Sequence, residues 1–307
     1  MLFSERLPMK VFSRHTTLSP APVLLAVAVV LALGVGCARP SAADRAQSLV
    51  RQHREEEAVA LLRKDLTARP DDVPARRLLV RLLGFTGDMP GARAETEELA
   101  RRLGPADPTP YLELGHALEL AHRYDEALEA YDQATAAAPS SPAGPREGGM
   151  RCARWGEVEQ ARPRLEEAAR RGANDAELWH ALGLVRLHLG DLDGAYEAYR
   201  AGVVVAPTAP ESWLGLATVA LTRGDGAGAL AAYDRLLQLR PRFAAAELGR
   251  AWALAKLGRR EEAARALDHA EELGASAGNV IRQRAALAAP ASPSPPPPPQ
   301  DGVKESE

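Results

Sequence analysis

Residues 176–209 have the pattern of two short helices separated by a break. The apolar and small residues that mark the two helix faces are Trp179, Leu182, Gly183, Ala195 and Tyr199. Their i, i+3 and i, i+4 spacings are those of residues that share one face of a helix. Gly190 and Asp191 interrupt the pattern, because glycine tolerates the positive φ that ends a helix and aspartate can cap the next one. The stretch therefore predicts a helical hairpin.

The same pattern recurs at a fixed interval, which is the separation of Trp179 and Trp213. One interval later it gives Trp213, Leu216, Gly224, Asp225, Ala229 and Tyr233; two intervals earlier it gives Tyr111, Leu114, Gly115, Ala127 and Tyr131. Units at 142–175 and 244–277 keep fewer of the marker residues, and two weaker units precede them at 39–72 and 73–107. The seven units are numbered here in chain order, and the first residue of each unit is position 1. A repeat array of this kind forms one elongated domain in which each unit contacts its neighbours.

The spelling W-x2-L-G…A-x3-Y…P from Trp179 to Pro207 resembles the tetratricopeptide (TPR) repeat. The resemblance implies an all-α, right-handed superhelical solenoid of about seven helical hairpins, and residues 279–289 can add a C-terminal capping helix. We expect four segments: a signal peptide at 1–36, a tether at 37–40, the solenoid at 41–289 and a disordered, proline-rich tail at 290–307.

The N-terminus has the features of an export signal. Arg6, Lys10 and Arg14 precede an apolar run at 23–36. The run is too short to span a bilayer as a helix, because a span needs about 20 residues. It therefore predicts a signal peptide rather than a transmembrane helix. Met9 offers a second start besides Met1.

Cys37 ends the apolar run, and the small residues before it resemble a bacterial lipoprotein processing site, although Gly34 stands where that site usually has leucine. The resemblance implies lipidation of Cys37; simple secretion and a retained anchor are the alternatives. A residue other than aspartate after the lipidated cysteine, here Ala38, implies the periplasmic face of the outer membrane. The only other cysteine, Cys152, is expected to be a small buried residue.

Two features exclude several classes of function. A net charge of −3 argues against a general nucleic-acid binder. No phosphate-binding loop, dinucleotide fingerprint, HExxH or CxxC pair occurs, and the GxSxG string at 274–278 lies between predicted helices rather than after a strand. We therefore expect no enzymatic activity, no cofactor and no metal.

Unit four departs from the pattern. Gly148 stands at position 7, where other units have a large residue, and Gly149 follows it at position 8. Pro163 lies inside the predicted second helix, where proline is unfavourable. We expect this hairpin to form but to be locally weak.

In TPR proteins the first helices of the hairpins line a concave groove, and positions 2, 5, 9, 12 and 13 commonly face a ligand. Carried over to this chain, they predict a groove containing Arg77, Arg81, Phe85, His116, Arg146, Arg154, His180, Leu184, His188, Leu214, Leu221 and Trp252. The N-terminal half would be rich in arginine and the C-terminal half apolar. The alternative is that the arginines only keep an alanine-rich array soluble.

These features predict a membrane-anchored interaction scaffold of the bacterial cell envelope, which binds an unidentified envelope protein in the groove. One alternative is an assembly factor similar to the TPR lipoproteins that assist type IV pilus secretin assembly. Another is a cytoplasmic TPR regulator, if residues 23–37 are not an export signal. The tail could instead be a ligand for a proline-recognition domain.

Overall fold

The structure is a computed structural model that describes residues 40–288, and within that range it contains 15 helices and no strand. The predictions for the signal peptide, Cys37 and the proline-rich tail lie outside the described residues. No helix in the described range is long and apolar enough to cross a membrane.

The helices pair into seven hairpins in the predicted register, followed by one further helix. The first helices are α2 (Ala42–Val50), α4 (Val73–Phe85), α6 (Thr109–Leu120), α8 (Ala143–Trp155), α10 (Ala176–His188), α12 (Pro210–Thr222) and α14 (Ala244–Lys256). The second helices are α3 (Glu55–Ala68), α5 (Met89–Leu103), α7 (Tyr124–Ala137), α9 (Val158–Arg170), α11 (Leu192–Val205), α13 (Gly226–Leu239) and α15 (Arg260–Glu272). The last helix, α16 (Ala277–Ala288), packs against α15 and α14 as the expected cap. The all-α solenoid fold is confirmed.

The breaks between helices have the predicted chemistry. Gly190 has a φ of +77°, a conformation that glycine adopts without strain, and it ends α10. The Asp191 side chain then accepts a hydrogen bond from the Gly194 backbone N–H and caps α11. At the start of the array, Ser41 and Asp44 form a reciprocal capping box that fixes where α2 begins.

A tyrosine on the second helix links one repeat to the next in units five and six. Tyr199, which is buried in α11, lies against Gly183 of its own unit and Gly215 of the following unit. A Cβ at Gly215 would come within 2.2 Å of the Tyr199 ring, so the close fit depends on the absence of a side chain there. Tyr233 and Gly249 repeat this arrangement one unit later. Burying such large side chains supplies much of the stability of the array.

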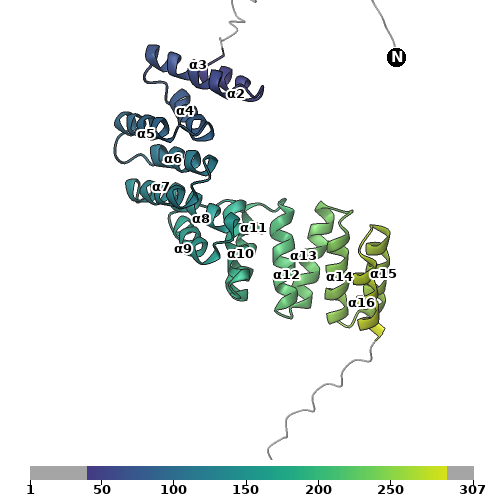
Figure 1. The fold of residues 1–307 in the computed structure, drawn as a ribbon. Helices are drawn as coiled ribbons and strands as arrows, with labels where there is room; N and C mark the ends of the chain where they lie inside the picture. The colour runs from purple at the N-terminus through teal and green to yellow at the C-terminus, as the bar shows by residue number, and fades with distance from the viewer. Residues whose placement is uncertain (1–39, 289–307) are drawn as a thin grey trace, which may run out of the picture.

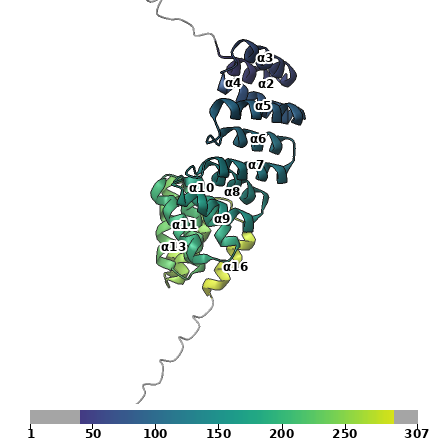
Figure 2. The same ribbon diagram turned by 90° about the vertical axis from the view of Figure 1, so that its left-hand side faces the viewer.

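The array bends at unit four. Figures 1 and 2 show α2 to α7 stacked in one arm and α10 to α16 in a second arm, with α8 and α9 between them. At this junction Gly148, at position 7 of the next unit, lies against the Cβ of Tyr131 and not against its ring, whereas the rings of Tyr199 and Tyr233 lie against a glycine at position 6 of the following unit. Position 6 of unit four is Glu147, so the ring-to-glycine contact of the later units has no counterpart here, and the stacking direction changes at this unit (Figure 1).

The unusual residues of unit four fit this geometry. Gly144 brings the backbone of α8 close to Thr135 of α7, and Gly149 leaves room for the Leu165 side chain of α9. Pro163 lies inside α9, and the helix continues through it to Arg170. Both helices of the hairpin form, as predicted, and Cys152 is fully buried between them.

The first helices lie on the inner side of the array. Each contacts the first helix of a neighbouring unit, as α4 contacts α6 and α10 contacts α12, whereas the second helices pack mainly on first helices. Elements on the inside of a curved stack are closer together than those outside. Gly84 permits the closest of these approaches, because a Cβ there would meet the backbone of Ala117 in α6.

Candidate partner-binding face

The predicted groove residues all lie on first helices or at their ends, on the surface that we call the inner face. This surface consists of the exposed side chains of α4, α6, α8, α10, α12 and α14. It divides into a polar stretch on α4, α6 and α8 and an apolar stretch on α10, α12 and α14.

The polar stretch is built around a buried carboxylate. Glu113 of α6 has a side chain only 1% exposed, and it receives hydrogen bonds from both Arg77 and Arg81 of α4. The distance from Arg77 Nε to Glu113 Oε1 is 2.7 Å, and that from Arg81 Nη2 to the same oxygen is 2.9 Å. The carboxylate of Glu113 therefore neutralises part of the positive charge of the two arginines, although each arginine side chain remains almost half exposed.

His116 joins this carboxylate to the next repeat. Its Nδ1 lies 3.8 Å from Glu113, and its Nε2 lies 3.6 Å from Glu147 of α8. Burial would raise the pKa of Glu113, but the neighbouring His116 and the two arginines outweigh it and lower that pKa to about 2. Burial lowers the pKa of His116, yet Glu113 and Glu147 more than compensate and raise it.

A second contact spans α6 and α8. Arg151 Nε of α8 lies 2.7 Å from Glu119 of α6, and Arg151 Nη2 also donates to Glu147 of its own helix at 3.3 Å. The helices α6 and α8 pack far less closely along their backbones than α4 and α6. Charged side chains therefore carry much of the connection between first helices at the bend.

The remaining predicted arginines differ from each other. Arg146 is enclosed by acidic groups: its guanidinium donates to Asp175 at 2.9 Å through two nitrogens, and to Glu147 and Glu177 at 3.1 Å. The hydrogen bonds to Asp175 make the largest contribution to raising the pKa of Arg146. Arg154 is exposed, and no carboxylate in the described range pairs with it. Of the four predicted arginines, only Arg154 presents a cation without a partner among residues 40–288.

The apolar stretch exposes large side chains. Leu184 of α10 is 39% exposed and Trp252 of α14 is 48% exposed, and both stand at position 9 of their units. Leu214 and Leu221 lie on α12, the helix between α10 and α14. Both side chains are half-buried and pack on the core of this arm. Exposed large apolar residues that recur at one repeat position suit contact with a partner.

The two predicted histidines of α10 lie apart. His180 is half-buried against the Tyr199 ring, with ring centroids 5.9 Å apart, and burial lowers its pKa. His188 is exposed, with its Nδ1 2.9 Å from the Leu184 carbonyl oxygen. No cluster of residues that could hold a metal ion occurs among residues 40–288.

Phe85 lies away from the arginines that precede it. It stands 55% exposed at the end of α4, and it lines a shallow pocket with Leu120 and His122, where α4 and α6 end. The structure thus brings Arg77, Arg81, His116 and Arg146 into one connected set of charges and leaves Phe85 at the edge of the array.

The carboxylates that connect these charges were not among the residues predicted from the sequence. Glu113 and Glu147 stand at position 6 of units three and four, and they are therefore one repeat apart. Units five to seven have Ala181, Gly215 and Gly249 at this position. The sequence did contain a signal for these carboxylates: an acidic residue repeats at a position where later units have a small residue.

The repeats match known family models. Residues 78–142 and 214–279 match one tetratricopeptide repeat model, and residues 176–219 match another. Together the matches cover more than half of the chain. No curated protein matches the chain.

Solved structures share the fold at low identity. The protein YrrB, described as a TPR protein with an unusual peptide-binding site, is 19% identical with a TM-score of 0.57 over 62% of this chain and 97% of its own. The C-terminal part of a TPR repeat-containing protein from Cytophaga hutchinsonii is 15% identical, with a TM-score of 0.58 over 78% of this chain and 98% of its own. A MamA protein is 20% identical, with a TM-score of 0.51 over 61% and 98%. The helical register, the family models and these structures agree, and the chain belongs to the tetratricopeptide repeat family.

Proposed function

We infer that this protein is a non-enzymatic scaffold of the bacterial cell envelope, which holds an extended or helical segment of another protein along its inner face. The observation that carries this inference is the exposure of Leu184 and Trp252 at the same repeat position of two first helices. Covering water-exposed leucine and tryptophan side chains lowers the free energy, and this favours binding of a partner. YrrB, a TPR protein with a peptide-binding site, supports the same use of the fold.

The charges of the polar stretch refine the expected partner. Arg77 and Arg81 share Glu113, and Arg146 is surrounded by carboxylates, so this stretch is closer to charge balance than its arginines suggest. Arg154, together with the exposed parts of Arg77 and Arg81, can still pair with a few carboxylates of a partner. The partner segment therefore needs apolar anchors for α10 to α14 and only a short acidic portion.

Site-specific photocrosslinking in cell membranes tests this proposal. A photoreactive residue at Leu184 should capture a partner, and one at Val204, which is 74% exposed on the second helix α11, serves as the control. Capture from Val204 but not from Leu184 would place binding on the outer helices and contradict the inner-face proposal.

Membrane attachment is proposed to occur through a lipid on Cys37, on the periplasmic face of the outer membrane. The support is the sequence alone: basic residues, a short apolar run and small residues before the cysteine. Metabolic palmitate labelling should mark the wild-type protein and not Cys37→Ser. A Cys37→Ser protein that still pelleted with membranes after a high-salt wash would exclude the lipid anchor.

A further inference from the structure

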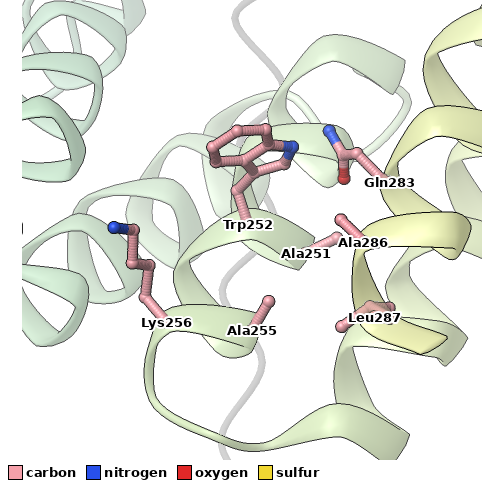
Figure 3. A pocket seen from close by; sticks show the side chains of 7 residues that line it. All are labelled: Ala251, Trp252, Ala255, Lys256, Gln283, Ala286 and Leu287. Atoms are coloured by element: carbon pink, nitrogen blue, oxygen red, sulfur yellow. The ribbon is translucent and has the colours of Figure 1, made fainter. Parts of the chain in front are cut away.

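The end of the array contains an open apolar pocket. It has a volume of about 220 Å³ and lies between the C-terminal halves of α14 and α16. Its lining consists of Ala251, Trp252, Ala255, Lys256, Gln283, Ala286 and Leu287. Figure 3 shows the indole ring of Trp252 between Lys256 and Gln283, with the indole nitrogen directed toward Gln283.

Trp252 differs from two other tryptophans of the same arm in the use of its N–H group. Trp179 donates its indole N–H to Asn174 at 2.8 Å, and Trp213 donates to the carbonyl of Pro207 at 2.9 Å. The Trp252 N–H makes no hydrogen bond with any residue in 40–288. The residue is 48% exposed, so this donor is accessible to a ligand. The pocket thus combines a flat apolar surface, a free donor and an amide side chain from Gln283.

These features suit a proline-rich segment. A polyproline II helix has no internal hydrogen bonds and presents its carbonyl oxygens outward, and its rings pack well on aromatic side chains. It therefore needs donors and an aromatic surface from its receptor. Lys256 adds a cation, with no carboxylate of residues 40–288 at ion-pair distance, and so favours an acidic residue near the prolines.

The chain itself contains such a segment directly after the pocket. The sequence that follows α16 includes five consecutive prolines at 295–299 and then Asp301, and residues 289–307 carry three acidic residues against one lysine. We propose that this tail folds back and docks in the pocket, with the prolines on Trp252 and Asp301 beside Lys256.

The dimensions agree with this placement. The stretch from Ala288 to Pro295 can extend over about 23 Å. To reach the pocket it must cross the distance between two packed helices, roughly 10 Å, and return along one helical turn, about 5 Å, so it is long enough. Trp252 and Lys256 are separated by about 6 Å along α14. Asp301 follows the last proline by two residues, which is also about 6 Å in a polyproline II helix.

Tethering raises the occupancy of the pocket above that expected for the isolated segment. A short linker gives the tail an effective concentration in the millimolar range at the pocket. The docked tail would cover Trp252, and it would therefore compete with any partner that uses the C-terminal end of the inner face. This inference does not depend on the identity of that partner.

Photocrosslinking within the full-length chain tests the proposal without any partner. A photoreactive residue in place of Gln283 should crosslink to peptides from residues 289–307, and one at Val204 should not. Replacing Pro296, Pro297 and Pro298 with glycine should reduce the yield from position 283 about tenfold, because glycine lacks the fixed φ by which consecutive prolines favour a polyproline II helix. These substitutions lie beyond the last helix of the solenoid, so a reduced yield does not arise from its unfolding.

Variants of the pocket separate its contributions. Trp252→Ala should reduce the yield about tenfold and Trp252→Phe, which keeps a ring but removes the N–H, by less. Lys256→Gln should reduce it only at low salt, where its charge is least screened. Absence of tail crosslinks from position 283, or a yield unaffected by the proline substitutions, would overturn the proposal. In an equal mixture of isotope-labelled and unlabelled chains, crosslinks between differently labelled chains would show docking on a second copy and would overturn folding back.

Discussion

The two stretches of the inner face use the same repeat positions for different chemistry. In units three and four, position 6 is glutamate, and Glu113 and Glu147 tie α4, α6 and α8 together through arginine and histidine. In units six and seven, position 6 is glycine, and Gly215 and Gly249 receive the tyrosine of the preceding unit. At this position, ion pairs therefore add to the packing between neighbouring repeats in one arm, whereas a tyrosine ring fills the space left by glycine in the other. The same hairpin fold accommodates a glutamate or a glycine at position 6, because each repeat packs only against its neighbours.

The largest expected effect follows from removing the cations of the polar stretch. Replacing both Arg77 and Arg81 with alanine leaves the carboxylate of Glu113 buried without its guanidinium partners. The loss in free energy of unfolding should be about 3 kcal/mol, toward the lower end for a buried pair because both arginines are partly hydrated. Urea denaturation, with hydrogen exchange of α6 to locate the loss, measures this.

The matched control adds Glu113→Leu to the double variant. A buried ion pair replaced by an apolar residue of similar size is often neutral, so most of the lost stability should return. Equal stability of the double variant and the wild type would show that Glu113 does not depend on the arginines.

The packed arm should respond to a single methyl group. Gly215→Ala places a Cβ about where the Tyr199 ring lies, and the overpacking should cost about 1–3 kcal/mol. Gly148→Ala is the comparison, since its Cβ would lie 3.3 Å from Tyr131 and the gain in helix propensity, about 1 kcal/mol, offsets much of the strain. Thermal unfolding of both variants checks the difference. A greater loss for Gly148→Ala would contradict the greater room that the structure shows at Gly148.

The two arms should also differ in their response to pH. The raised pKa of His116 in the polar stretch contributes stability that is present below pH 6.5 and is lost as pH rises through the raised pKa. The lowered pKa of His180 in the apolar stretch contributes stability that is present above pH 6.5 and is lost as pH falls through the lowered pKa. Glu113 adds stability above pH 4.5, which is lost between pH 4.5 and about 2.

Unfolding measured from pH 2 to 9 in the wild type and in His116→Gln and His180→Gln checks these signs. His116→Gln should remove a decrease in stability that begins above pH 6.5, and His180→Gln should remove one that begins below pH 6.5. Identical curves for the two variants would mean that neither histidine senses its surroundings as the contacts indicate.

The smallest expected effect is that of Arg154→Glu. Arg154 is exposed and has no carboxylate partner in the described range, so the change in stability should stay within about 0.5 kcal/mol. Arg146→Glu should cost more, because it places a new carboxylate among Asp175, Glu147 and Glu177. Thermal unfolding distinguishes them, and equal losses would indicate that Arg146 is not held by its acidic neighbours.

Most of the fold could be predicted from the sequence. The repeat interval, which varies by one residue only at unit two, predicts the seven hairpins, and the Gly190-Asp191 break predicts the helix ends, because both depend on local chemistry that repeats. The bend could not be predicted in this way, because it depends on contacts across a unit boundary and not on the pattern within one repeat. The pairing of Arg77 and Arg81 was missed for a similar reason: Glu113 belongs to the next repeat, and its burial depends on how closely α4 and α6 approach at Gly84.

The bend between the two arms limits the shape of whatever binds along the inner face. A straight helix of about 20 residues is about 30 Å long and rigid along its axis. Such a rod can follow one arm, but it must leave the surface at α8 and α9, where the stacking direction changes (Figure 1). A ligand that touches both arms needs a joint of its own, such as a proline or a glycine, at the point that meets unit four. The protein would thus select its ligands by where they flex as well as by their side chains.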